Sequence, residues 1–136
     1  MIIALINWRI IPSEVESFLE EWMTKLPLNN AEGLIGEFLS KVEGTGFFSG
    51  ITWEMEPDEK DDKAGWRSYN YVSYVNVGFW ATKEDFMNAV GKYMSQGRSI
   101  VKPFEAAPRR RAILTPEAWR RGAINLPPET SPGVTP

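Results

Sequence analysis

The chain has 136 residues, a hydrophobic fraction of 43% and a net charge of −3, which describes one globular domain and not a disordered chain. This charge gives no reason to expect a nucleic-acid partner, because phosphate binding needs a clear excess of lysine and arginine on one face. The chain has no cysteine and no histidine, which excludes disulfides, thiolate chemistry, histidine bases and the usual proximal haem ligand.

Residues 2–10 form an apolar run that ends before Pro12 and predicts a buried strand. The run is too short to span a bilayer, which takes about 20 residues, and it lacks the basic leader of a signal peptide. We therefore expect a cytoplasmic protein with no membrane partner. Ser13 and Glu16 have the spacing of a capping box, which opens an amphipathic helix with the apolar stripe Val15, Phe18, Leu19, Trp22, Met23 and Leu26.

Residues 33–40 predict a second strand, and the alternation of residues 51–55 favours its continuation beyond a glycine-rich stretch. Residues 54–63 carry six acids and two lysines and predict a solvated hairpin loop. A calcium site in this loop is disfavoured, because the glycine and distal glutamate of an EF-hand are missing at the required offsets. We therefore expect no metal.

Residues 69–80 are rich in tyrosine, valine and phenylalanine and predict the strongest strand of the chain. Thr82 is the expected N-cap of a second helix, with the stripe Phe86, Ala89, Val90, Tyr93 and Met94. Residues 98–107 predict a short helical piece around Pro103, residues 109–114 a last strand, and residues 116–121 an amphipathic turn. The predicted domain covers residues 1–122, and a proline-rich tail covers residues 123–136.

The order of elements is βαββαβ, which predicts an α+β, ferredoxin-like fold with a four-stranded antiparallel sheet and an extended hairpin between the second and third strands. Two helices can cover only one face of such a sheet. Both faces of the first strand are nevertheless apolar, with Ile3 and Leu5 on one and Ile2, Ala4 and Ile6 on the other. We therefore expect a homodimer in which two sheets pack together as a dimeric α/β barrel.

Strand periodicity places Asn76, Gly78 and Trp80 on one face of the third strand, where the missing side chain of Gly78 leaves space beside a large aromatic residue. Asn7 is a second amide inside an apolar strand. A buried amide without a partner costs about 1–3 kcal/mol, so each should bind protein, water or a ligand. The alternative stays open that each Asn is a satisfied bulge or edge residue and that Trp80 belongs to the core.

The segment at residues 74–80 reads YVNVGFW, and the segment at residues 82–86 reads TKEDF. Together they resemble the third strand and second helix of the antibiotic-biosynthesis monooxygenase family. Asn7, Asn76 and Trp80 match the positions at which its cofactor-independent, anthrone-type members carry functional Asn, Asn and Trp. The haem-degrading branch needs a histidine that this chain lacks. The resemblance therefore implies a monooxygenase with no cofactor, whose partners are a small aromatic substrate and O2.

The mechanism implied by the resemblance is driven by the substrate, whose carbanion passes an electron to O2 before the radicals recombine and collapse to a quinone. Asn7 and Asn76 would donate hydrogen bonds to the enolate oxygen, and Trp80 would stack on the substrate. Further substrate contacts are assigned to five residues: Tyr74, Gly78, Arg9, Trp22 and Phe86. The alternative is a non-catalytic dimeric-barrel protein that binds a hydrophobic small molecule or acts as an assembly partner.

Overall fold

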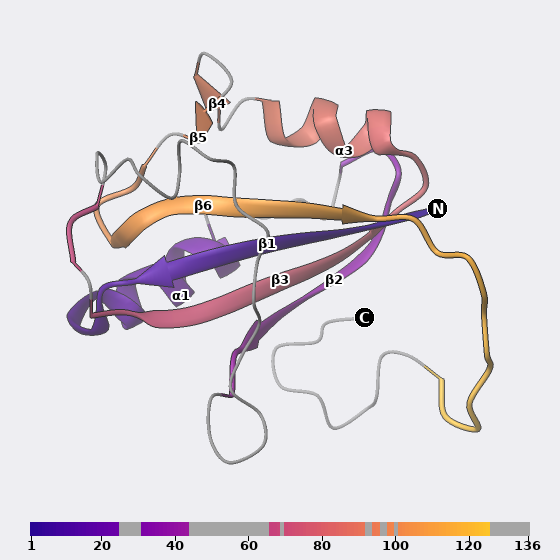
Figure 1. The fold of residues 1–136 in the computed structure, drawn as a ribbon, viewed down its shortest axis with the longest axis horizontal. Coiled ribbons are helices and arrows are strands. Elements are labelled where there is room, and N and C mark those ends of the chain that lie inside the picture. The colour runs from indigo at the N-terminus through magenta and orange to yellow at the C-terminus, as the bar shows by residue number, and fades with distance from the viewer. Residues whose placement is uncertain are drawn as a thin grey trace.

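The structure, a computed structural model, describes residues 1–24, 31–43, 66–68, 70–91, 94–95, 98–99 and 101–125. Its main sheet contains β1 (Ile2–Ile10), β2 (Leu34–Lys41), β3 (Val72–Trp80) and β6 (Glu105–Leu114), with helices α1 (Val15–Thr24) and α3 (Lys83–Val90) (Figure 1). The strands are all antiparallel in the order β2-β3-β1-β6, which is the ferredoxin-like arrangement of an α+β fold. The predicted fold class is confirmed.

The first helix starts differently from the predicted capping box. A 3-10 turn at Pro12–Glu14 precedes α1, and its N-cap residue is Ile11, with no side-chain cap hydrogen bond. Proline suits the first position of a helical turn, because its fixed φ is helical and its missing N–H would be unpaired there. The turn therefore begins one residue before Ser13, which lies inside it.

The second helix begins as predicted, since the Thr82 hydroxyl accepts a hydrogen bond of 3.0 Å from the backbone N–H of Asp85. The predicted helical piece at residues 98–107 is wrong. Those residues contain β5 (Arg98–Ser99), which pairs with β4 (Met94–Ser95), and then a turn that leads into β6. Strand β6 starts four residues earlier than predicted and includes Pro108, which is tolerated because β6 is an edge strand and its register against β1 shifts there.

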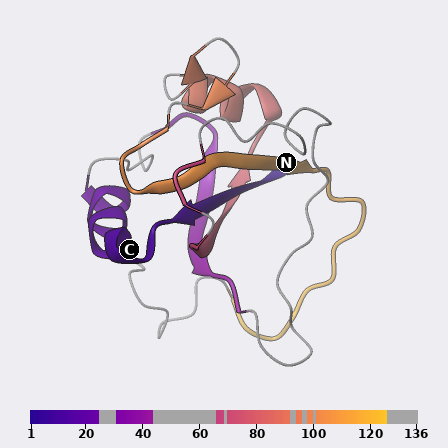
Figure 2. The ribbon, with the colours of Figure 1, turned by 60° about the vertical axis from the view of Figure 1, so that its left-hand side comes forward.

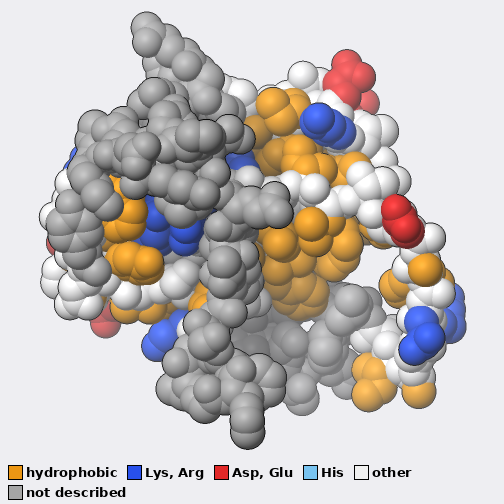
Figure 3. Space-filling model, viewed as in Figure 1, with side chains coloured by type: hydrophobic (Ala, Val, Ile, Leu, Met, Phe, Trp, Pro, Cys, Tyr) orange, Lys and Arg blue, Asp and Glu red, His pale blue; other side chains and the backbone are white. Residues whose placement is uncertain are grey.

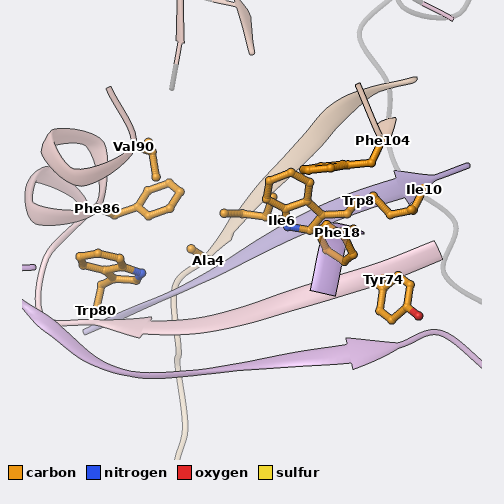
Figure 4. Close-up of a cluster of buried hydrophobic side chains, with 10 residues drawn as sticks. All are labelled: Ala4, Ile6, Trp8, Ile10, Phe18, Tyr74, Trp80, Phe86, Val90 and Phe104. Carbon is orange, nitrogen blue, oxygen red and sulfur yellow. The ribbon is translucent and has the colours of Figure 1, made fainter. Parts of the chain in front are cut away.

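Both helices lie on the same face of the sheet, which we call the helix face (Figure 2). The buried core joins Phe18 of α1 and Phe86 of α3 to the even-numbered side chains of β1. Figure 4 shows two groups in this core, one at each helix. Trp80, Phe86 and Val90 lie at α3, and Trp8, Phe18, Tyr74 and Phe104 lie at the other end.

The opposite face of the sheet has a polar end and an apolar end. Cross-strand pairing places Asn7 and Arg9 at one end, and Leu5 opposite Val77 and Ile3 opposite Phe79 toward the other. Figure 3 shows hydrophobic side chains gathered over this part of the sheet, with blue arginine and lysine side chains to their left. Parity alone predicted this apolar character.

Several predictions fall on residues that the structure does not describe. They include the continuation of the second strand at residues 51–55, the acidic loop at 54–63 and most of the proline-rich tail. Strands β2 and β3 pair as the two arms of a hairpin, with the Val42 N–H donating to the Ser73 carbonyl at 2.9 Å. The turn predicted at residues 116–121 is wrong, because these residues are exposed and have no regular structure.

Candidate functional site

Strand register decides which predicted site residues can meet. Asn76 pairs with Ile6 and Trp80 pairs with Ile2, so both side chains lie on the helix face. Asn7 pairs with Val75 and lies on the opposite face. The two amides therefore cannot donate to one substrate oxygen within a single chain, as the resemblance had implied.

Asn7 is fully buried, with 0% of its surface exposed, and its amide is saturated by protein groups. Its Nδ2 donates to the Ser73 Oγ at 2.7 Å and to the Tyr74 carbonyl at 3.0 Å. Its Oδ1 accepts from Arg110 Nε at 3.2 Å and Nη2 at 2.8 Å. This geometry suits a cross-link between β1, β3 and β6, in which no amide atom is left for a ligand.

Arg9 shares the face of Asn7, as parity predicted, but it is 1% exposed, unlike the solvated arginine usual at a strand end. Its Nη2 donates to the Pro108 carbonyl, and its guanidinium lies 4.6 Å from the centroid of the Trp66 ring. Arg9 therefore lies on the face of the sheet opposite to Asn76 and Trp80. A cation stacked on an aromatic face in a buried position adds stability at this end of the sheet.

The helix face carries a carboxylate that sequence reasoning missed. Glu37 of β2 pairs with Gly78 of β3, and its Oε2 accepts a hydrogen bond of 3.0 Å from the Asn76 Nδ2. The Asn76 Oδ1 is buried and has no hydrogen-bond partner among the described residues. A buried acceptor in this state is costly unless a ligand or water donates to it. As placed, Asn76 therefore offers a ligand an acceptor.

Burial raises the pKa of the Glu37 carboxyl above its ordinary value of 4.5, and the hydrogen bond from Asn76 opposes this effect. Glu37 is half-buried, and it makes no other hydrogen bond or ion pair among the described residues. The sequence signal was an acid in a strand between apolar neighbours, Ile35 and Phe38 among them. A charged residue at such a position calls for a partner, and here the partner is Asn76.

The space predicted at Gly78 is filled by Trp80 itself. A Cβ on Gly78 would lie 2.9 Å from the indole Nε1, so the glycine is required for the indole to lie over the strand. Trp80 is 1% exposed, and its ring packs edge-on against Phe86 with centroids 5.7 Å apart. In this structure Trp80 and Phe86 therefore pack together beneath α3, and the indole leaves no open space at Gly78.

Tyr74 and Trp22 belong to the other end of the core. Tyr74 is buried with its ring centroid 5.3 Å from that of Phe18, and Trp22 of α1 packs half-buried against the same core. The structure thus brings together three of the eight predicted residues, Gly78, Trp80 and Phe86, and places Asn76 on the same face of β3. It places Tyr74 and Trp22 beside the α1 end, and Asn7 and Arg9 on the opposite face.

The three successive arginines of β6 alternate between faces, as predicted. Arg110 binds Asn7 on the opposite face, while Arg111 pairs with Ile6 on the helix face. Burial and, to a smaller extent, repulsion from Arg109 lower the pKa of Arg111 to about 10, although attraction to Glu105 partly opposes both effects. Asn76 pairs with Ile6 from the other side, so Ile6 separates Arg111 from Asn76 by about 10 Å, two strand spacings.

In the part of the chain that the structure describes, no three Asp, Glu, His or Cys side chains gather as metal ligands would. The helices α1 and α3 of the described part are also too short and polar to cross a membrane.

Comparison with known proteins gives a structural likeness only. No family model matches the chain, and no curated protein matches it. One solved structure that matches is that of a mutant of SnoaB, described as a cofactor-independent oxygenase from Streptomyces nogalater, at a TM-score of 0.39 and 13% identity. The alignment covers 93% of this chain and 98% of that chain. A likeness at this level carries no argument about activity.

Proposed function

We propose that this protein is a cofactor-independent monooxygenase that oxidises a polycyclic, phenolic, anthrone-like metabolite with O2 to a quinone. The observation that supports it most is the buried Asn76 Oδ1, which has no hydrogen-bond donor among the described residues, on an amide whose Nδ2 donates to the Glu37 carboxylate. A phenolic hydroxyl could donate to that oxygen. The aromatic residues Trp80 and Tyr74 lie on the same face of β3 as Asn76 and suit the binding of a flat ring system.

The reaction balances without any cofactor. An anthrone methylene becomes a carbonyl, one O2 is consumed and one water is released. The substrate first loses a proton, and its carbanion then reduces O2 by one electron. The two radicals combine into a peroxide, whose O–O bond breaks as the carbonyl forms. The protein has to bind the substrate, stabilise the enolate oxygen and exclude water.

A homodimer is part of this proposal. The apolar end of the opposite face, formed by Ile3, Leu5, Val77 and Phe79, would pack against the same face of a second copy. Light scattering behind size-exclusion chromatography should give a dimer mass for the wild type. Val77→Asp should give the monomer, because a charge would be buried in the interface.

A second candidate is a non-catalytic protein that binds a hydrophobic small molecule or acts as an assembly partner. The burial of Trp80 against Phe86 favours it, since a fully packed indole is also what a core residue would show. Whether the protein accelerates the oxidation of an anthrone decides between the two candidates.

The test is quinone formation from 1,8-dihydroxyanthrone (dithranol) in air, with a metal chelator present. Wild type should exceed the uncatalysed rate, and Asn76→Ala should lower kcat/KM by about 10-fold or more, the effect of losing a hydrogen bond of about 1–3 kcal/mol to the substrate hydroxyl. Trp80→Phe should also reduce the rate. Asn88→Ala and Trp119→Phe are matched controls, because both residues are exposed, and they should keep the full rate. No quinone above background with several anthrones would reject the proposal.

A further inference from the structure

The proposed oxidation begins with the loss of a substrate proton, so it needs a base. The chain has no histidine or cysteine, which leaves carboxylates as the side chains that accept protons most readily near neutral pH. On the helix face, the carboxylate that contacts the candidate site is Glu37, through its hydrogen bond to Asn76. No role was assigned to it by the family resemblance.

The contact leaves one carboxylate oxygen for the substrate. Oε2 is held by the Asn76 Nδ2 at 3.0 Å, while Glu37 makes no other hydrogen bond or ion pair among the described residues. Oε1 has no hydrogen-bond partner among the described residues and is not fully buried, so it retains some access to solvent. A general base needs an oxygen in this condition, fixed in position and still able to accept a proton.

We propose that Glu37 is the general base of the reaction and that the side-chain amide of Asn76 flips, exchanging the positions of Oδ1 and Nδ2, when Glu37 becomes protonated. This inference rests on the proposed function. It differs from the family resemblance in naming a carboxylate and in giving Asn76 two successive roles. With Glu37 charged, Asn76 donates to it and accepts from the substrate hydroxyl. With Glu37 protonated at Oε1, the carboxyl rotates so that this O–H donates to Oδ1, and Nδ2 becomes free to donate to the enolate oxygen.

The proton balance closes over the whole reaction. Glu37 takes the first methylene proton, and the substrate carbanion gives one electron to O2. After the radicals combine, protonated Glu37 returns its proton to the peroxide anion. Glu37 then removes the second hydrogen from the same carbon, the O–O bond breaks, and the departing hydroxide takes that proton to leave as water. Glu37 ends as the carboxylate with which it began.

The surroundings of Glu37 support this role. Burial is the main cause of its raised pKa, which brings the carboxyl closer to neutral pH and makes it a stronger base than an exposed glutamate. Other charged or titratable groups lie on the elements that form this face: Lys41 on β2, Tyr74 on β3, Glu105, Arg109 and Arg111 on β6, Asp85 on α3 and Glu21 on α1. None of these contributes to the shift, which arises from burial and from Asn76.

The decisive experiment separates proton removal from oxidation. In D2O without oxygen, NMR follows the exchange of the methylene protons of 1,8-dihydroxyanthrone, which requires a base but no O2. Wild type should accelerate this exchange. Glu37→Gln should slow the protein-dependent exchange by about 10²-fold or more, the usual contribution of general-base catalysis. Glu37→Asp should restore part of it, because the carboxylate is retained.

Controls make the result specific. Glu43→Gln alters an exposed glutamate just after β2 and should exchange and oxidise at the wild-type rate. Circular dichroism and the unfolding temperature should show that Glu37→Gln is folded. The acid limb of the rate–pH profile should be present in wild type and missing from the residual activity of Glu37→Gln. A purely structural role would not remove that limb.

The outcomes distinguish the two proposals. Exchange and oxidation that are both unchanged in folded Glu37→Gln would overturn the role of Glu37 and leave the proposed function standing. Exchange that depends on Glu37 without any quinone formation in air would support the base and reject the monooxygenase. Neither exchange nor oxidation in wild type would overturn both.

Discussion

Replacing Asn7 by alanine should destabilise the protein strongly while leaving its site chemistry intact. Asn7 is 0% exposed and makes four hydrogen bonds, two of them from the Arg110 guanidinium. Hydrogen bonds to a charged group contribute more than neutral ones, and the partners of Asn7 would be left buried without a hydrogen bond. We therefore expect the free energy of unfolding to fall by about 3 kcal/mol. For a domain of this size that loss lowers Tm by about 10 °C.

Urea denaturation and calorimetry measure this effect, and a double-mutant cycle with Arg110→Ala isolates the contribution of the pair. The coupling energy should be about 1–2 kcal/mol, and dithranol oxidation per folded molecule should stay close to that of wild type. A structural role of Asn7 is contradicted if Asn7→Ala keeps its Tm within about 2 °C, a small fraction of the expected change, while activity disappears. That result would return Asn7 to the catalytic role implied by the family resemblance.

Three further predictions concern the helix face. Gly78→Ala should cost about 1–3 kcal/mol, because its Cβ would lie 2.9 Å from the Trp80 Nε1, whereas Gly36→Ala meets no atom within 4 Å and should change Tm little. Glu105→Gln should lower the free energy of unfolding by about 3 kcal/mol in urea denaturation, because it breaks an ion pair of 2.9 Å with the buried Arg109 guanidinium. A loss below about 1 kcal/mol would contradict this. Glu37 has a pKa raised above 4.5, so its contribution to stability is full below that pH and is lost as the pH rises through the folded-state pKa. Glu37→Gln should therefore gain stability relative to wild type as the pH rises from 4 to 7, and a difference that is constant with pH would contradict the shift.

Local patterns were sufficient to predict most of the fold. The apolar run of residues 2–10 and the β-rich run ending at Trp80 became β1 and β3, and Thr82 caps α3 through its hydroxyl as its position suggested. The start of α1 was misplaced because proline at the first turn competed with the capping-box pattern. The length of β6 was missed because residues 98–107 were predicted to be a helical piece around Pro103, whereas β6 starts at Glu105 and accepts Pro108 as an edge strand with a register shift.

The candidate site was harder to predict. Parity shows which side chains of one strand share a face, but it does not show which side chains of the neighbouring strand lie on that same face. A one-residue change of register moves every side chain to the other face. The pairing of Ile6 with Asn76 therefore separates Asn76 from Asn7, although both amides looked equally suited to one site. Glu37 became visible only once β2 was aligned with β3, which brings it beside Asn76 across 39 positions of sequence.

We propose that this chain oxidises an anthrone with O2 alone. The most direct measurement is the stoichiometry of the reaction of 1,8-dihydroxyanthrone with dissolved O2, followed by an oxygen electrode and by quinone absorbance, with chelator and no added cofactor. We expect one O2 to be consumed per quinone formed, at a rate proportional to protein concentration and strongly reduced in Asn76→Ala. Oxygen uptake that is independent of protein, or equal in wild type and Asn76→Ala, would contradict it.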